Sequence, residues 1–168
     1  YKDYQTLKNI YFNNYKTNAD FSLSDFLTNT SIEYFEFKNN SIGGSLDANN
    51  AFEGCPNLNS FNFSYVNVSR NFNFMDLSLI SENISFSNLY VTGNVEGSFQ
   101  NIKFNTTNPA NLININNIIT NGTIKINFNN VPVNNISLSK FFAKDINFES
   151  FLINCTLNNQ YVRVKHIT

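Results

Sequence analysis

The most constraining feature of the sequence is a spacing of apolar residues that returns along the whole chain. Its first clear copy spans residues 32–46 and reads Ile32-x-x-Phe35-x-Phe37-x-x-Asn40-x-Ile42-x-Gly44-x-Leu46. Related copies follow at intervals of about 23–29 residues. A period of this length is typical of a solenoid, in which each unit buries its apolar face against its neighbours.

Within each copy, apolar and polar residues alternate, which is the period of a half-buried strand. The apolar positions of the later copies are Phe61, Phe63, Val66, Val68 and Phe72; Ile84, Phe86, Leu89, Val91 and Val95; Ile113, Ile115, Ile118 and Ile124; Ile136, Leu138 and Phe141; and Val162, Val164 and Ile167. Glycine returns at Gly93 and Gly122, so Gly44, Gly93 and Gly122 are expected at tight bends. There a side chain would clash or φ must be positive.

Over about residues 26–168 the pattern resembles the leucine-rich repeat family, in the extracellular, plant-type-like subtype L-x-x-L-x-L-x-x-N-x-L-x-G-x-I. The resemblance implies an α/β-type solenoid with a parallel concave β-sheet, a largely irregular convex side and a recognition role. The chain departs from the family at the asparagine position, which is kept only at Asn40. A right-handed parallel β-helix, whose coils have a similar length, is the structural alternative.

Two regions follow from this reading. Residues 1–25 form an N-terminal capping segment, expected to be helical because Tyr4, Leu7, Ile10 and Tyr11 follow helical spacing. One more repeat, built on Leu7, Ile10, Phe12 and Tyr15, fits the same segment. Residues 26–168 form the solenoid, with about six repeats, and its strand-like end over 161–167 lacks a polar cap. We therefore expect the natural protein to continue beyond the C-terminus.

The sequence offers no catalytic constellation. His166 is the only histidine, and G-x-S-x-G, P-loop and paired-cysteine metal motifs are missing. We therefore expect no enzyme activity, cofactor or metal site. A formal net charge of −1 argues against nucleic acid as the main partner. No stretch is long and apolar enough to span a membrane.

The two cysteines, Cys55 and Cys155, are expected to be unpaired, mostly buried thiols. They lie about four repeats apart, which places them roughly 20 Å apart at the spacing of neighbouring strands. A disulfide requires Cα atoms within about 7 Å of each other. The repeat register therefore predicts no disulfide.

The chain carries nine N-x-[ST] sequons, which are acceptor sequences for N-glycans in secreted proteins. Together with the extracellular repeat subtype, they favour an extracellular or cell-surface glycoprotein. The sequons lie at Asn29, Asn39, Asn62, Asn67, Asn83, Asn105, Asn121, Asn135 and Asn154.

The leading functional hypothesis is a non-catalytic extracellular recognition or adhesion module, such as part of a receptor ectodomain, that binds a protein partner. Exposed aromatic and charged residues on the concave strands would carry specificity. These residues are Glu33, Tyr34, Glu36, Lys38, Tyr65, Lys140, Tyr161, Arg163 and Lys165. One alternative is a structural matrix or filament component that self-associates end to end, since acidic residues dominate before residue 100 and basic residues after it. Another is a β-helix acting on polysaccharide.

Overall fold

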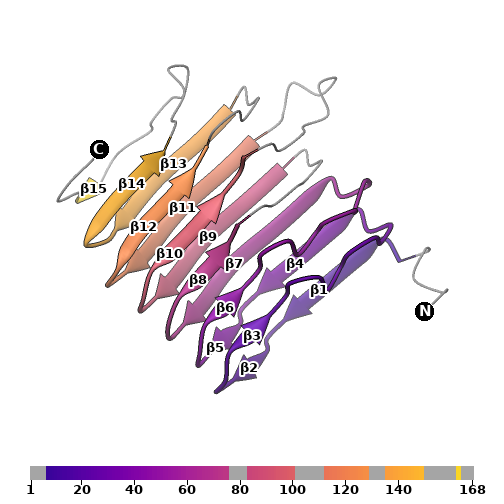
Figure 1. The fold of residues 1–168 in the computed structure, drawn as a ribbon, viewed down its shortest axis with the longest axis horizontal. Coiled ribbons are helices and arrows are strands. Elements are labelled where there is room, and N and C mark those ends of the chain that lie inside the picture. The colour runs from indigo at the N-terminus through magenta and orange to yellow at the C-terminus, as the bar shows by residue number, and fades with distance from the viewer. Residues whose placement is uncertain (1–6, 76–82, 101–111, 129–134, 150–161, 164–168) are drawn as a thin grey trace.

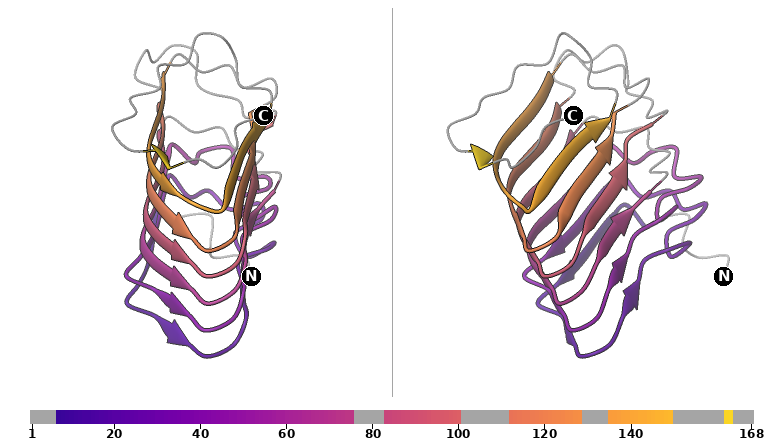
Figure 2. Two further views of the ribbon diagram at one scale, coloured as in Figure 1. Left: turned by 90° about the vertical axis from the view of Figure 1, so that its left-hand side faces the viewer. Right: turned by 60° about the vertical axis from the view of Figure 1, so that its left-hand side comes forward.

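The computed structural model describes residues 7–75, 83–100, 112–128, 135–149 and 162–163. In these ranges the chain is a parallel β-solenoid built from strands, turns and loops, with no helix (Figure 1). Each coil contributes one long strand, or two shorter ones, to a first sheet and one short strand to a second. Figure 2 shows the two sheets facing each other, joined along one edge by turns. The expectation of a repeat solenoid is thus confirmed.

We call the nine-stranded sheet the long sheet and the six-stranded sheet the short sheet; all strand pairings in both are parallel. The long sheet runs in the order β1 (Asn9–Asn13), β4 (Tyr34–Lys38), β7 (Ser60–Val68), β9 (Asn83–Val91), β11 (Leu112–Thr120), β13 (Asn135–Phe142) and β15 (Val162–Arg163), with β2 (Lys16–Thr17) and β5 (Ser41–Ile42) beside it. The short sheet contains β3 (Phe21–Ser22), β6 (Leu46–Asp47), β8 (Phe72–Phe74), β10 (Val95–Ser98), β12 (Thr123–Asn127) and β14 (Asp145–Glu149).

The expectation of an α/β leucine-rich repeat is wrong, and the β-helix alternative describes the fold. The physical reason lies after the glycine position, where apolar and polar residues continue to alternate. Ile124 and Ile126, for example, are buried on either side of exposed Lys125 and form β12. The segment that would cross the irregular convex side of a leucine-rich repeat is therefore a second strand.

The N-terminal segment is also different from the expected helical cap. Residues 9–22 form β1, β2 and β3, which make a complete first coil. Ile10 pairs with Phe35 and Phe12 with Phe37, so this coil continues the register of the next one. The alternative of one more repeat was the better reading. Residues 1–6, which belong to the expected cap, lie outside the residues that the structure describes.

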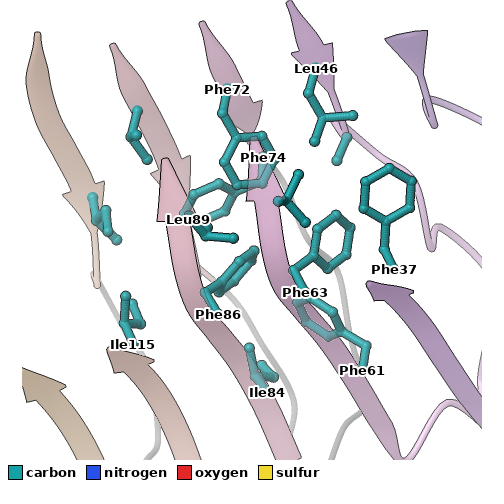
Figure 3. Packing of buried hydrophobic residues seen from close by; sticks show 14 of the residues in the cluster. Phe37, Leu46, Phe61, Phe63, Phe72, Phe74, Ile84, Phe86, Leu89 and Ile115 are labelled. Atoms are coloured by element: carbon teal, nitrogen blue, oxygen red, sulfur yellow. The ribbon is translucent and has the colours of Figure 1, made fainter. Parts of the chain in front are cut away.

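The core between the two sheets is a set of columns in which each coil places a side chain beneath its neighbour. One column contains Phe12, Phe37, Phe63, Phe86, Ile115 and Leu138. Phe63 lies at its centre, with ring centroids 5.1 Å from Phe37 and 5.5 Å from Phe86 (Figure 3). Each buried phenylalanine contributes about 1.5–3 kcal/mol by leaving water. This packing accounts for many of the 18 phenylalanines.

A second column runs along the bend of the long sheet, where one residue per coil has a left-handed backbone with φ between 53° and 60°. Its members are Asn14, Asn39, Tyr65, Asn88, Asn117 and Lys140. Asparagine tolerates this conformation better than most residues, whereas tyrosine and lysine do so at some cost. The residue after the bend is buried in most coils, as Val66 is after Tyr65, whereas the residue before it ranges from buried Ser64 to half-buried Ser87. The bend therefore interrupts the strict alternation of the strand.

The repeated glycines mark close approach between coils, and none of the three has a positive φ. A Cβ on Gly44 would lie 2.4 Å from the backbone nitrogen of Asp20. A Cβ on Gly122 would lie 2.5 Å from the carbonyl oxygen of Gly93. A Cβ on Gly93 would lie 2.8 Å from the carbonyl oxygen of Arg70. The expectation of a clash is confirmed, and the alternative of positive φ is not.

Asn40, which keeps the asparagine of the family pattern, satisfies backbone groups of the neighbouring coil. Its side chain is 1% exposed and bonds to the coil before it. Asn40 Oδ1 accepts a hydrogen bond from the Tyr15 backbone N–H at 2.8 Å, and its Nδ2 donates to the Phe12 carbonyl at 2.8 Å. Later coils fill this column with apolar Val66, Leu89 and Ile118 instead.

Two further expectations concern the cysteines and the last repeat. Cys55 is a free, buried thiol, as expected, and Cys155 lies outside the described residues. The last copy is shifted from its predicted register, because Val162 pairs with Phe141 rather than with the position of Ile136. Val164 and Ile167 lie outside the described part.

Candidate recognition surface

The candidate site is the side of the long sheet that faces away from the core, which we call the outer face. Three columns of outward residues cross it before the bend. They contain Asn9, Tyr34, Ser60 and Asn83; Tyr11, Glu36, Asn62, Ser85 and Asn114; and Asn13, Lys38, Ser64, Ser87 and Asn116. Neighbouring members lie about 4.8 Å apart along a column. The face is therefore a regular array of side chains on a rigid support.

Its N-terminal end carries a cluster of Tyr11, Asn13, Tyr34, Glu36 and Asn62, which we call the tyrosine–glutamate cluster. The Glu36 carboxylate accepts hydrogen bonds from Asn13 Nδ2 at 2.7 Å and from the Tyr34 hydroxyl at 3.1 Å. Asn13 Oδ1 also accepts from the Lys38 backbone N–H at 3.0 Å. The Tyr11 and Tyr34 rings lie 5.5 Å apart at 43°. The bonds and ring contact hold the cluster's side chains in place before any partner arrives.

The cluster changes the chemistry of Tyr34. Partial burial raises the pKa of its phenol, and the hydrogen bond to Glu36 and the negative charge of that carboxylate raise it further. A smaller contribution comes from Tyr11, and a hydrogen bond with Asn62 acts in the opposite direction. Tyr34 is therefore a neutral hydrogen-bond donor at physiological pH, held against a carboxylate.

Charges flank the cluster on both sides. Lys8 Nζ forms an ion pair with Glu33 Oε1, and both side chains are about half exposed. Lys38, the last residue of β4, is half-buried. Because exposed ion pairs contribute little to stability, these charges matter more for partner choice than for the fold.

The C-terminal half of the outer face carries uncharged hydroxyl and amide side chains before the bend. Asn117 Nδ2 donates to Asn88 Oδ1 at 2.7 Å, and the Ser139 hydroxyl bonds with Asn116 Oδ1 at 3.1 Å. These bonds link neighbouring coils across the face. Lys140, at the bend of β13, is an exposed charge at this end.

Beyond the bend, the outward column becomes apolar. It runs from Asn67 through Tyr90 and Ile119 to Phe142, and we call the last three residues the apolar strip. Tyr90 is 45% exposed and Phe142 is 38% exposed. A shallow pocket of about 240 Å³ lies here, lined by Asn67, Val68, Ser69, Tyr90, Val91, Thr92, Ile119, Thr120 and Asn121. We call it the turn-edge pocket.

The residues selected from the sequence fall into three groups. Tyr34, Glu36 and Lys38 lie on the outer face, and Glu33 directly precedes β4. Tyr65 and Lys140 lie further along, at the bend. Arg163 is in β15, whereas Tyr161 and Lys165 lie outside the described residues. The concave face of a leucine-rich repeat is thus replaced by the outer face of the long sheet.

Sequence reasoning missed Tyr11 and Asn13 of the cluster and all three residues of the apolar strip, Tyr90, Ile119 and Phe142. The signal for the first two was present, because Ile10 and Phe12 fit one more repeat and would place Tyr11 and Asn13 outward. Tyr90 and Phe142 lie beyond the left-handed bend, where the period of two restarts. The three-residue step from Phe86 to Leu89 in the repeat marks that restart, so the alternation could have placed Tyr90 outward.

The described sequons lie on several parts of the solenoid. Asn62 and Asn83 lie on long-sheet strands, as expected, and Asn135 opens β13. Exposed asparagines occur at Asn29 in a loop, at Asn39 on the bend, and at Asn67 and Asn121 beside the turn-edge pocket. Asn105 and Asn154 lie outside the described part of the chain.

A search for sites of other kinds found none within the described ranges. No group of three or more His, Cys, Asp or Glu side chains is arranged to hold a metal ion there. The same residues include no helix that could cross a membrane. Comparison of the chain with known protein families, curated proteins and solved structures found no match.

Proposed function

We propose that the protein is a non-catalytic extracellular recognition module that binds a protein partner through the outer face of its long sheet. The observation that carries the proposal is the tyrosine–glutamate cluster. It combines two neighbouring tyrosines, a carboxylate and amide groups on a rigid sheet. Tyrosine is enriched at binding hot spots because it offers a large contact area with a polar end.

The contacts within the cluster support binding rather than acid–base chemistry. Glu36 already accepts hydrogen bonds from Asn13 and Tyr34, and Glu33 is paired with Lys8. Both carboxylates are therefore already held by partners, whereas the two carboxyl groups of a glycosidase act on the substrate and on water. Tyr11 is 62% exposed, so its ring is available to a partner.

The test uses labelled protein bound to intact cells of the source organism, measured by flow cytometry. The outer-face variant combines Tyr11→Ser with Tyr34→Ser. Its matched control, Asn73→Ser with Lys125→Ser, changes two residues on the outer side of the short sheet. Loss of a hot spot worth about 2 kcal/mol weakens binding about 30-fold, whereas the control keeps the wild-type affinity.

Treatment of the cells before binding identifies the class of partner. Protease treatment is expected to abolish binding, whereas removal of glycans from the cells leaves it intact. Equal binding by both variants would overturn the proposed surface. Loss of binding only after glycan removal would replace the protein partner with a carbohydrate. Breakdown of an acidic polysaccharide by the purified protein would contradict the non-catalytic assignment.

A further inference from the structure

The apolar strip is the least expected part of the outer face. Tyr90, Ile119 and Phe142 lie in one column on three consecutive coils and are at least partly exposed. Exposed apolar side chains that adjoin one another on a folded protein usually have a covering partner. Apart from its tyrosines, the outer face before the bend is mostly polar, so the strip requires a separate explanation.

Asn67, the asparagine of a glycosylation sequon, directly precedes the strip in its column, after Lys16 and Ser41 of the earlier coils. Asn67 pairs with Tyr90 in adjacent strands, so the Asn67 side chain leaves the sheet beside the tyrosine ring, about 4.8 Å along the column. Asn67 and the third sequon residue, Ser69, are both exposed. A sugar attached to Asn67 would therefore start at the end of the apolar strip.

The turn-edge pocket fits the chemistry of such a sugar. Its lining residues include Tyr90 and Ile119 together with Ser69 and Thr92, which carry hydroxyl groups. Thr120 also lines it, but its hydroxyl is buried and bonds to the Gly93 carbonyl. The C–H faces of a pyranose ring pack against an aromatic ring, while its hydroxyl and amide groups bond with polar side chains at the rim. A volume of about 240 Å³ accommodates a single sugar ring.

We infer that Asn67 carries an N-glycan whose first sugar residues occupy the turn-edge pocket and cover Tyr90 and Ile119. This inference rests on the extracellular location in the proposed function. The glycan is covalently attached, so it occupies the pocket at high effective concentration without needing high intrinsic affinity. Asn121 also lines the pocket, but it comes from the turn after β11 and lies outside the column of the strip.

A glycan at Asn67 itself would not cover the tyrosine–glutamate cluster, although that cluster contains the Asn62 sequon. The tyrosine–glutamate cluster lies on β1, β4 and β7 before the bend, whereas Asn67 lies beyond the bend near the end of β7. One part of the long sheet would thus bind the partner, and another would be shielded by the protein's own glycan. Shielding prevents the strip from associating with other apolar surfaces.

The test compares variants secreted from a eukaryotic host. Ser69→Ala removes the Asn67 sequon without changing the asparagine, and Ser31→Ala removes the Asn29 sequon as a matched control. Glycopeptide mass spectrometry measures occupancy, and thermal unfolding and binding of an apolar dye measure shielding. We expect Asn67 to be occupied, and Ser69→Ala to lower Tm by about 2–4 °C and to raise dye fluorescence. Ser31→Ala should do neither.

A second pair of variants tests the contact with the strip. In a Tyr90→Ser background, removing the Asn67 sequon should change Tm and dye fluorescence by less than half as much, because the ring that the glycan covers is absent. The inference would be overturned if removing the Asn67 sequon changed Tm and dye fluorescence as much in the Tyr90→Ser background as in the wild type. Equal changes in Ser69→Ala and Ser31→Ala would overturn it too. If Asn67 carries no glycan while other sequons do, the inference is overturned as well, but the proposed function is left intact. Empty sequons throughout would remove the support for an extracellular location too.

Discussion

The first three coils and the last three follow the same backbone path but fill it differently. In the core of the early coils phenylalanine dominates, as at Phe37 and Phe63. In the core of the later coils isoleucine and leucine dominate, as at Ile115 and Leu138. The outer face differs in the same direction. Charges and tyrosines occupy it in the early coils, and serine and asparagine in the later ones.

This difference teaches that the backbone repeat does not depend on one type of core residue. Strand register continues without interruption from Phe63 through Phe86 to Ile115, where aromatic packing gives way to aliphatic packing. A core accepts such changes when the volume of each layer is kept. Phe74 and Gly97 show this balance, because a large residue lies directly beside the smallest one.

The largest expected effect is the loss of an aromatic ring from the early coils. Phe63 has ring contacts with Phe35, Phe37, Phe61, Phe72 and Phe86. Phe63→Ala should lower the free energy of unfolding by about 3–5 kcal/mol, measured by chemical denaturation. Ile115→Ala, at the equivalent position of a later coil, is the comparison and should cost less. Equal losses would show that the aromatic stack adds nothing to aliphatic packing.

A smaller effect is expected where the two types of packing meet. A Cβ on Gly97 would lie 2.0 Å from the ring of Phe74, so Gly97→Ala should cost about 1–3 kcal/mol through overpacking. Phe74→Leu makes room, and the double variant should be less destabilised than the sum of the two single variants. Thermal and chemical unfolding of all three variants test this. If the loss of unfolding free energy in the double variant equalled the sum of the two single losses, Gly97 and Phe74 would not compete for the same space.

The polar core position of the early coils provides the third comparison. Asn40→Leu places in this column the residue that Leu89 supplies in a later coil. The Tyr15 N–H and the Phe12 carbonyl then lose their partner, at a cost of about 1–3 kcal/mol. Hydrogen exchange at the Tyr15 amide should accelerate, while Ile115 stays protected. Unchanged exchange at Tyr15 would show that the first coil does not need this bond.

The smallest expected effect concerns Tyr34, whose raised pKa is a property of the early outer face. A raised pKa favours the neutral phenol in the folded state. Its contribution to stability is therefore complete below the unfolded value of about 10 and is lost as pH rises through the folded value. NMR titration of the Tyr34 ring should give a lower pKa in Glu36→Gln than in the wild type. It should remain above 10, because burial is the largest cause. An unchanged pKa would exclude the contribution of Glu36.

The recognition surface was only partly predictable from the sequence. Tyr34, Glu36 and Lys38 were identified because they alternate with Phe35 and Phe37 on one strand. Their partner Asn13 lies about one coil earlier along the chain, and no local pattern joins it to Glu36. Tyr90 lies between the core positions Leu89 and Val91, so the repeat itself indicates that it faces outward, whereas Phe142 directly follows Phe141, where the identified copy ended.

The sequence by itself determined that the chain is a solenoid, how long its coils are and which residues face the core. Those properties follow from the alternation of apolar residues and its return at each coil, as from Phe61 to Ile84 to Ile113. Only the tertiary structure decided between a leucine-rich repeat and a two-sheet solenoid. The choice depends on whether the segment after each bend pairs with its counterpart in the next coil. That pairing is made by backbone hydrogen bonds between residues more than twenty positions apart. The alternation at Ile124 and Ile126 is typical of a strand, but it does not specify which strand lies beside it.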